Sequence, residues 1–308
     1  MSPPHARAVF DPDEDGDRCI RAAVAILVSY LALTTLPMLR AWNMPALRVP
    51  LLAHVGVLTI ASIALLKTDH PHLRSVRAWL PLLLGPFLYI ELRWLIVGAG
   101  FPHHDTAVAS WEAFLFPSDP SRTLAVDWAS LALSETLHLA YVSYYALIYV
   151  PPLALWLRRR RRAFDATMLA LAVVYAACFF TYVMFPVDGP RFLHGASAAP
   201  DGPIRAAVMR LLAGGSSRGT AFPSSHVAAS VVASICALRF QPRLGSLVAF
   251  LSVLLAIGAV YGGYHYATDI IAGLATGLLS SAVAFLLEQQ LTRGRPTTQQ
   301  RVAERQAT

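Results

Sequence analysis

The chain has 308 residues and a formal net charge of +7, is 56% hydrophobic and only 14% charged, and has a mean hydropathy of +0.52. A soluble globular domain carries about 25% charged residues, so this composition excludes an ordinary soluble protein. The basic residues stand between apolar runs rather than in one patch. That distribution argues against a nucleic-acid partner and is typical of membrane topology signals.

Eight apolar runs are long enough to cross a hydrocarbon core about 30 Å thick, so we expect an all-α, polytopic transmembrane helical bundle. The predicted spans are residues 22–38, 50–67, 79–98, 134–157, 167–186, 223–240, 244–262 and 268–288. The first run lacks a small-residue cleavage signal and is predicted to be a span rather than a signal peptide. Three cysteines without pairing or metal-ligand spacing are predicted to be buried and inert: Cys19, Cys178 and Cys236.

Five consecutive arginines, Arg158 to Arg162, follow the fourth span and predict the cytoplasmic side of the membrane there. On this topology 17 of the 25 Lys and Arg lie inside and seven lie outside. Both termini are then cytoplasmic, and the 187–222 loop is outside. Residues 99–133 are too polar for a further span, but "WEAFLF" (111–116) and "DWASLALS" (127–134) are predicted as short interfacial helices.

The sequence "AFPSSH" (221–226) places a proline and two serines directly before an apolar run, which is a helix-start signal. The free N–H groups and positive dipole end of such a helix suit a phosphate. The hydroxyls of Ser224 and Ser225 would add donors, and His226 would lie in the first turn. The alternative is an ordinary helix cap with an interfacial histidine.

Two more polar motifs fall on the same predicted side. In "DGPRF" (188–192), Arg191 follows a turn just outside a span, where its guanidinium suits either a substrate phosphate or lipid head groups. In "YHYATD" (264–269), His265 and Asp269 share a face if a helix begins there. The carboxylate would then fix the imidazole tautomer and leave the other nitrogen as nucleophile or base. A metal site and a purely structural pair remain alternatives.

Together these motifs resemble the type 2 phosphatidic acid phosphatase superfamily, and more closely its branch of inositol phosphorylceramide and sphingomyelin synthases. "LHLAYVSYYALIYVPP" (137–152) is similar to a stretch common in that branch, and the resemblance runs from about residue 79 onward. It implies that His226 is the general acid, His265 the nucleophile and Asp269 the residue that orients it. It also implies that the substrate phosphate is held by Arg191, Ser224 and Ser225.

The resemblance divides the chain into four expected parts. These are a cytoplasmic amino-terminal segment (1–21), two additional transmembrane helices (22–78), a six-helix catalytic membrane domain (79–290) and a disordered cytoplasmic tail (291–308).

The chain departs from the superfamily pattern at two phosphate-binding cations. Residue 259 is alanine where the superfamily has an arginine six residues before its nucleophilic histidine. The superfamily also has a lysine upstream of its first arginine, but the single lysine of this chain, Lys67, lies on the predicted cytoplasmic side. A monoanionic diester needs less positive charge than a dianionic monoester, so this departure favours a head-group transferase. Arg93, near the outer end of the third span, is predicted to supply part of the missing charge.

Other ionisable residues are candidates for support. Glu135 and His138 stand at i, i+3 near the outer end of the fourth span and are expected to face the bundle interior, where they bind an acceptor or pair with each other. Tyr266, beside His265, is a further support candidate. His103–Asp105 is predicted to be a solvated polar loop rather than a metal site.

The sequence therefore predicts an integral membrane phosphotransferase or phosphatase that acts on membrane lipids through a phosphohistidine, without a cofactor or metal. The alternatives are a phosphomonoesterase of phosphatidic acid, phosphatidylglycerophosphate or polyprenyl diphosphate, and a lipid transporter. The ionisable groups gather at one face rather than at the midplane, which argues against transport. Arginine in place of lysine, with abundant alanine, suggests a GC-rich bacterial genome and a periplasmic site. Oligomeric state is not predicted.

Overall fold

The computed structural model describes residues 14–66 and 71–292, and this part of the chain is α-helical without a strand. Predictions for residues 1–13, 67–70 and 293–308 lie outside the described residues. The helices are α1 (Glu14–Arg40), α2 (Pro45–Leu66), α3 (Pro71–Ala99), α4 (Asp105–Leu115), α5 (Pro120–Asp127), α6 (Leu131–Val142), α7 (Tyr144–Leu157), α8 (Arg161–Met184), α9 (Pro190–His194), α10 (Pro203–Gly215), α11 (Ser225–Phe240), α12 (Pro242–Tyr261) and α13 (Ala267–Thr292).

Six helices are long and apolar enough to cross a membrane, namely α1, α2, α3, α8, α12 and α13. The predicted span 134–157 is not straight, because α6 and α7 meet at 45° on either side of Ser143. The Ser143 hydroxyl donates to the Ala140 carbonyl at 2.6 Å, and such back-bonding bends helices. Helix α11 has 16 residues and is about 24 Å long, shorter than a usual span. The all-α bundle is confirmed, with six or seven candidate spans in the described residues rather than eight.

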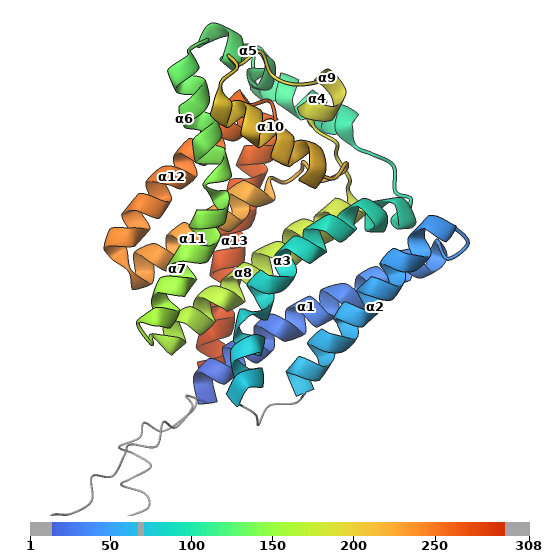
Figure 1. Cartoon of the computed structure of the whole chain (residues 1–308), viewed down its shortest axis with the longest axis vertical. Helices are drawn as coiled ribbons and strands as arrows, with labels where there is room; N and C mark the ends of the chain where they lie inside the picture. The colour runs from blue at the N-terminus through green and yellow to red at the C-terminus, as the bar shows by residue number, and fades with distance from the viewer. Residues whose placement is uncertain (1–13, 67–70, 293–308) are drawn as a thin grey trace, which may run out of the picture.

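Helix α8 forms the centre of the bundle (Figure 1) and packs against α1, α3, α11 and α13. Of its most apolar stretch 67% is buried, against 17% for the peripheral helix α2. Cys178 on α8, Cys19 on α1 and Cys236 on α11 are all buried, as predicted, and none of the three forms a disulfide bond.

A buried hydrogen-bond network joins the first three helices. His54 of α2 pairs through Nδ1 with Glu91 of α3 at 2.9 Å. Its Nε2 lies 2.9 Å from the Leu31 carbonyl of α1, and a carbonyl can only accept, so Nε2 carries a proton. Unsatisfied polar groups are costly in hydrocarbon, so this network stabilises one arrangement of the three helices.

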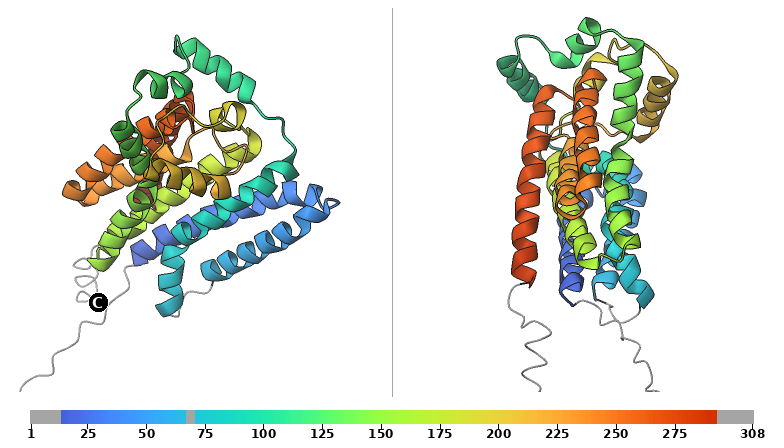
Figure 2. Two further views of the ribbon diagram at one scale, coloured as in Figure 1. Left: turned by 45° about the horizontal axis from the view of Figure 1, so that its top comes forward. Right: turned by 90° about the vertical axis from the view of Figure 1, so that its left-hand side faces the viewer.

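The short helices α4, α5, α9 and α10 form a cap at one end of the bundle (Figure 1). The start of α1 and the end of α13 lie at the other end of the bundle (Figure 2). The junction of α7 and α8, which carries Arg158 to Arg162, lies there too. The motif 111–116 falls almost entirely in α4, but the prediction of a helix over 127–134 is wrong. Asp127 ends α5, the Ser130 side chain caps α6, and Leu131 begins it.

Candidate active site

The two motif histidines face one small cavity beneath the cap. His226 is the second residue of α11, and His265 lies two residues before the start of α13. Their ring centroids are 6.2 Å apart, and both line a cavity of about 40 Å³ together with Arg191. The cavity is also lined by residues that sequence analysis did not single out, among them Tyr89, Tyr141, Asp188, Ser216, Ser217, Thr220 and Tyr264.

Asp269 contacts His265 but does not line the histidine cavity. Its Oδ2 is 3.3 Å from Nδ1 of His265 and accepts the Tyr266 N–H at 2.8 Å. Helix α13 begins at Ala267, so Asp269 is the third helical residue and its carboxylate reaches back to the residue before the helix, as in one half of a capping box. The carboxylate is fully buried. Because a carboxylate accepts, this contact favours Nδ1 as the donor, and the neutral imidazole of His265 then has its lone pair on Nε2.

The helices that carry the two histidines pack closely together. The Ser224 N–H donates to the Asp269 carbonyl at 3.0 Å. Gly273 and Gly277 of α13 each approach an α11 carbonyl so closely that a Cβ would come within 2.7 Å of it. Small residues permit this approach between membrane helices, and it fixes the separation of the two histidines.

The start of α11 is braced from two sides. Ser224 is the N-cap and accepts from the Val227 N–H at 3.4 Å. The Tyr182 hydroxyl of α8 accepts from the Ser225 N–H at 3.0 Å and donates to the Pro223 carbonyl at 2.7 Å. Two N–H groups of this helix start therefore already have partners, and neither serine lines the histidine cavity. Their predicted phosphate contact remains a proposal.

Arg191 is held over the cavity by the short helix α9. Its Nη1 donates to Ser216 Oγ at 2.7 Å. The preceding turn requires glycine at position 189, because its φ is +81° and a Cβ would lie 2.7 Å from that of Ala221. The predicted phosphate ligand is thus placed on the same cavity as both histidines.

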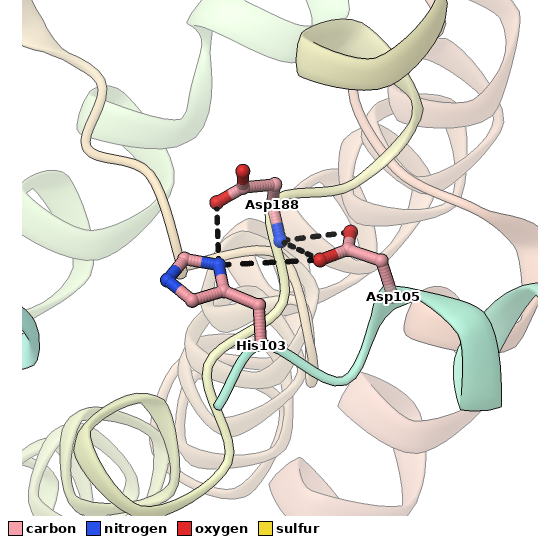
Figure 3. Close-up of side chains that lie close together, drawn as sticks. All are labelled: His103, Asp105 and Asp188. Carbon is pink, nitrogen blue, oxygen red and sulfur yellow. Dashed lines mark hydrogen bonds and ion pairs between the residues drawn. The ribbon is translucent and has the colours of Figure 1, made fainter. Parts of the chain in front are cut away.

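His103, Asp105 and Asp188 bring one ligand atom each within 4.8 Å of one another (Figure 3). Asp105 accepts the backbone N–H groups of Asp188 and Gly189 at 3.0 and 2.9 Å. Asp188 is 3.0 Å from His103 Nδ1 and 3.1 Å from Arg218 Nε. Because both carboxylates already accept hydrogen bonds or pair with basic side chains, we interpret the cluster as a structural contact that stabilises the turn before Arg191. It is less solvated than the polar loop predicted from sequence.

Glu112 of α4 is a site residue that sequence reasoning missed. The side chain is 2% exposed and accepts the N–H groups of Ala267 and Thr268 at 3.0 and 2.8 Å, as well as the Thr268 hydroxyl. It thereby caps α13 from a distant segment and adds a negative charge at the positive end of that helix. Nothing in "WEAFLF" reveals this role, because the partners are 155 residues away.

Replacing Glu112 with glutamine is expected to lower turnover about tenfold, because one acceptor at the start of α13 is lost. Glu288→Gln, at the far end of the same helix, removes an ion pair with Arg239 and is expected to change turnover less than twofold. Single-turnover rates and substrate binding are measured together. A loss of binding and rate in the same proportion would indicate a general folding defect instead of a positioning role.

Glu135 does not pair with His138. Its carboxylate accepts the N–H groups of Ile204 and Arg205 at 2.8 and 2.9 Å and so caps α10. His138 is buried, with Nδ1 2.6 Å from the Ser134 carbonyl and its ring against Tyr264. Neither side chain lines the histidine cavity. The contacts therefore support a structural role for Glu135 and His138 and do not support the predicted binding of an acceptor substrate.

Tyr266 packs under the cap rather than into the cavity. It is 2% exposed, and its hydroxyl is 3.5 Å from His194 Nε2. Burial, and then nearby carboxylates including Asp119 and Asp105, raise the pKa of Tyr266 to about 12. It therefore stays a neutral hydrogen-bond donor at ordinary pH.

Ala259 occupies an apolar place beside the cavity. It is fully buried among Tyr141, Val208 and Tyr264, and its carbonyl accepts the N–H groups of Tyr264 and His265 at 2.9 and 3.2 Å. Among the described residues that line the histidine cavity, Arg191 is then the single arginine. Arg93 lines a neighbouring cavity instead.

An apolar cavity of about 170 Å³ opens from the histidine cavity between α3, α7, α8 and α10. The two cavities share Tyr89, Tyr141, Leu212, Ser216 and His226. The His226 ring is thus placed at the junction, with the Tyr144 ring 4.4 Å away between centroids.

Comparison with known proteins gives one family. The model of the PAP2 superfamily matches residues 107–283, from α4 to α13, and leaves α1, α2 and α3 outside the match. No curated protein and no solved structure was found to match the chain.

Proposed function

The chain belongs to the PAP2 superfamily, and from that membership we propose that it transfers a phosphorylated head group between membrane lipids through a phosphohistidine on His265. Membership supports phosphatase or phosphotransferase chemistry on lipid phosphates in general. The observation that carries the finer proposal is that Arg191, His226 and His265 line one cavity. In addition, the Asp269 carboxylate contacts Nδ1 of His265.

In the first step, Nε2 of His265 attacks the phosphorus of a lipid phosphodiester held by Arg191. A P–N bond forms and the bond from phosphorus to the glycerol oxygen breaks. His226 donates its proton to that oxygen, which leaves as diacylglycerol. Asp269 stabilises the positive charge that develops on the His265 ring.

In the second step, the hydroxyl of an acceptor lipid gives its proton to His226, now a neutral base. The acceptor oxygen attacks phosphorus, the P–N bond breaks, and His265 regains its lone pair. Both histidines return to their starting protonation states. Water in place of the acceptor would give hydrolysis with the same residues, so the residues alone do not separate transferase from phosphatase.

The preference for a diester rests on charge. One arginine lines the histidine cavity among the described residues, and the place of a second is taken by Ala259. A diester phosphate carries one negative charge, which one guanidinium neutralises, whereas a monoester carries nearly two at pH 7. The adjoining apolar cavity would receive part of an acyl chain, and its tyrosine-rich lining is compatible with a lipid hydroxyl.

We further propose that the site faces the periplasm of a bacterial inner membrane. The support is the position of the five arginines of the α7–α8 turn at the end of the bundle opposite the cap, together with the preference of arginine for the cytoplasmic side.

The test is a panel of lipid phosphates and phosphodiesters in nanodiscs, with and without diacylglycerol or ceramide. New phospholipid with little free phosphate would support transfer. Free phosphate from monoesters alone would assign the protein as a phosphatase. Binding without any turnover would favour a transporter.

Activity is expected to stay within about twofold when EDTA is added, because the chain itself supplies the nucleophile, the acid and a cation. The measurement is turnover before and after chelation. A loss of activity that Mg²⁺ restores would contradict this and would reopen the cluster of His103, Asp105 and Asp188 as a metal site.

A further inference from the structure

A second polar cavity, of about 570 Å³, adjoins the histidine cavity on the α3 side. Its lining includes two arginines, Arg93 of α3 and Arg218 of the loop before α11. The two cavities share Asp188, Ser216 and Ser217. They are therefore neighbours with a common wall, and one substrate could extend into both.

The charge of this second cavity is not balanced by its own side chains. Arg218 is paired with Asp188, with Nε 3.1 Å from Oδ2. Arg93 forms no ion pair with any residue that the structure describes, and its buried Nε has no hydrogen-bond partner there. Its guanidinium carbon lies 5.5 Å from the centre of the Trp94 ring. A buried donor without an acceptor is costly, and a bound anion would accept from the Arg93 Nε.

Because the two cavities share a wall, an anion bound by Arg93 would lie close to the reacting phosphate but in a different cavity. Ser216 Oγ accepts from Arg191 Nη1 at 2.7 Å and lines both polar cavities. Neither His226 nor His265 lines the second cavity. A group held by Arg93 is therefore not the one that His265 attacks.

The three cavities match the three parts of a phosphodiester lipid. The apolar cavity would take chain, the histidine cavity would take the diester phosphate, and the second polar cavity would take the head group. We propose that the second cavity binds the head group of the donor lipid and that Arg93 selects a head group carrying an additional phosphate. This inference rests on the proposed function, because it assumes that the diester phosphate lies at His265.

The test compares two donors that differ by one phosphate, phosphatidylinositol and phosphatidylinositol 4-phosphate, in nanodiscs at fixed ionic strength. Both equilibrium binding and diacylglycerol release are measured for the unchanged protein, Arg93→Gln and Arg210→Gln. Arg210 is exposed on α10, lines neither polar cavity and donates to the Ala206 carbonyl, so its variant controls for the loss of one positive charge.

The unchanged protein is expected to bind the 4-phosphate more tightly, and Arg93→Gln to lower that preference about tenfold, the loss expected for one charge-assisted hydrogen bond. Arg210→Gln is expected to keep the preference. A preference that is absent, or that is equal in the unchanged protein and Arg93→Gln, would overturn the inference. Binding of phosphatidylinositol itself is expected to be the same in Arg93→Gln and the unchanged protein, which distinguishes the loss of one contact to the second phosphate from misfolding.

The binding measurement separates this inference from the function on which it rests. If neither lipid releases diacylglycerol or labels a histidine, but the Arg93-dependent preference persists, the subsite stands and the transferase proposal fails. If diacylglycerol is released without that preference, the transferase proposal stands and the subsite is wrong.

Discussion

Replacing His265 with alanine is expected to lower turnover by more than about 10³-fold, because the proposed nucleophile is removed while the phosphate cavity remains. Arg191 and His226 line that cavity independently of His265, since they lie on α9 and α11. Substrate binding should therefore survive. The measurement is a quenched reaction with a donor labelled at phosphorus, followed by mapping of the labelled peptide.

His226→Ala gives the matched comparison on the other histidine. It is also expected to slow turnover, but the label should still appear on His265, because loss of the general acid and base slows both steps without removing the nucleophile. Label on His226 in the His265 variant would reverse the assigned roles. Unchanged turnover without His265 would exclude the phosphohistidine route.

The apolar pattern alone predicted most of the bundle. Each apolar run is helical, and one of them forms two helices, α6 and α7, because runs of this length satisfy their backbone groups only as helices in hydrocarbon. The break at Ser143 was not predicted, since a bend depends on how α6 and α7 pack rather than on hydropathy. Helices α9 and α10 were missed inside a stretch taken for a loop, because their stability comes from contacts outside their own sequence. Glu135, which caps α10, is one such contact.

The site was predictable where its geometry is local. The spacing of His265 and Asp269 sufficed to predict their contact, which the structure shows at 3.3 Å. Convergence of Arg191 and His226 on the same cavity was inferred from topology and resemblance, since these residues lie on different helices. The cap of α13 by Glu112 could not be predicted, because no local pattern connects positions 155 residues apart. Distant contacts of this kind position the local motifs.

The role of Asp269 gives the second large expected effect. Asp269→Asn is expected to lower turnover about 10²- to 10³-fold although the side chain keeps its size, because a neutral amide does not stabilise the positive charge that develops on the His265 ring. Oδ2 now accepts from both His265 Nδ1 and the Tyr266 N–H. An asparagine whose oxygen takes the Oδ2 position keeps both bonds and leaves its NH₂ at the Oδ1 position, which has no hydrogen-bond partner among the described residues. The tautomer of His265 is then kept, and the loss of rate comes from the missing negative charge beside the ring.

This prediction separates the effect of the Asp269 charge on the reaction from its effect on stability. Asp269 is fully buried at the start of α13, where its charge is favourable to the helix, so the substitution also has a structural cost. The thermal midpoint and lipid binding are therefore measured with the rate of phosphohistidine formation. A rate that falls by two orders of magnitude while lipid binding is retained would assign Asp269 to stabilising the positive charge on the His265 ring. A rate within about fivefold of the unchanged protein would mean that the Asp269 carboxylate is a helix cap, and that its charge is not needed for the reaction.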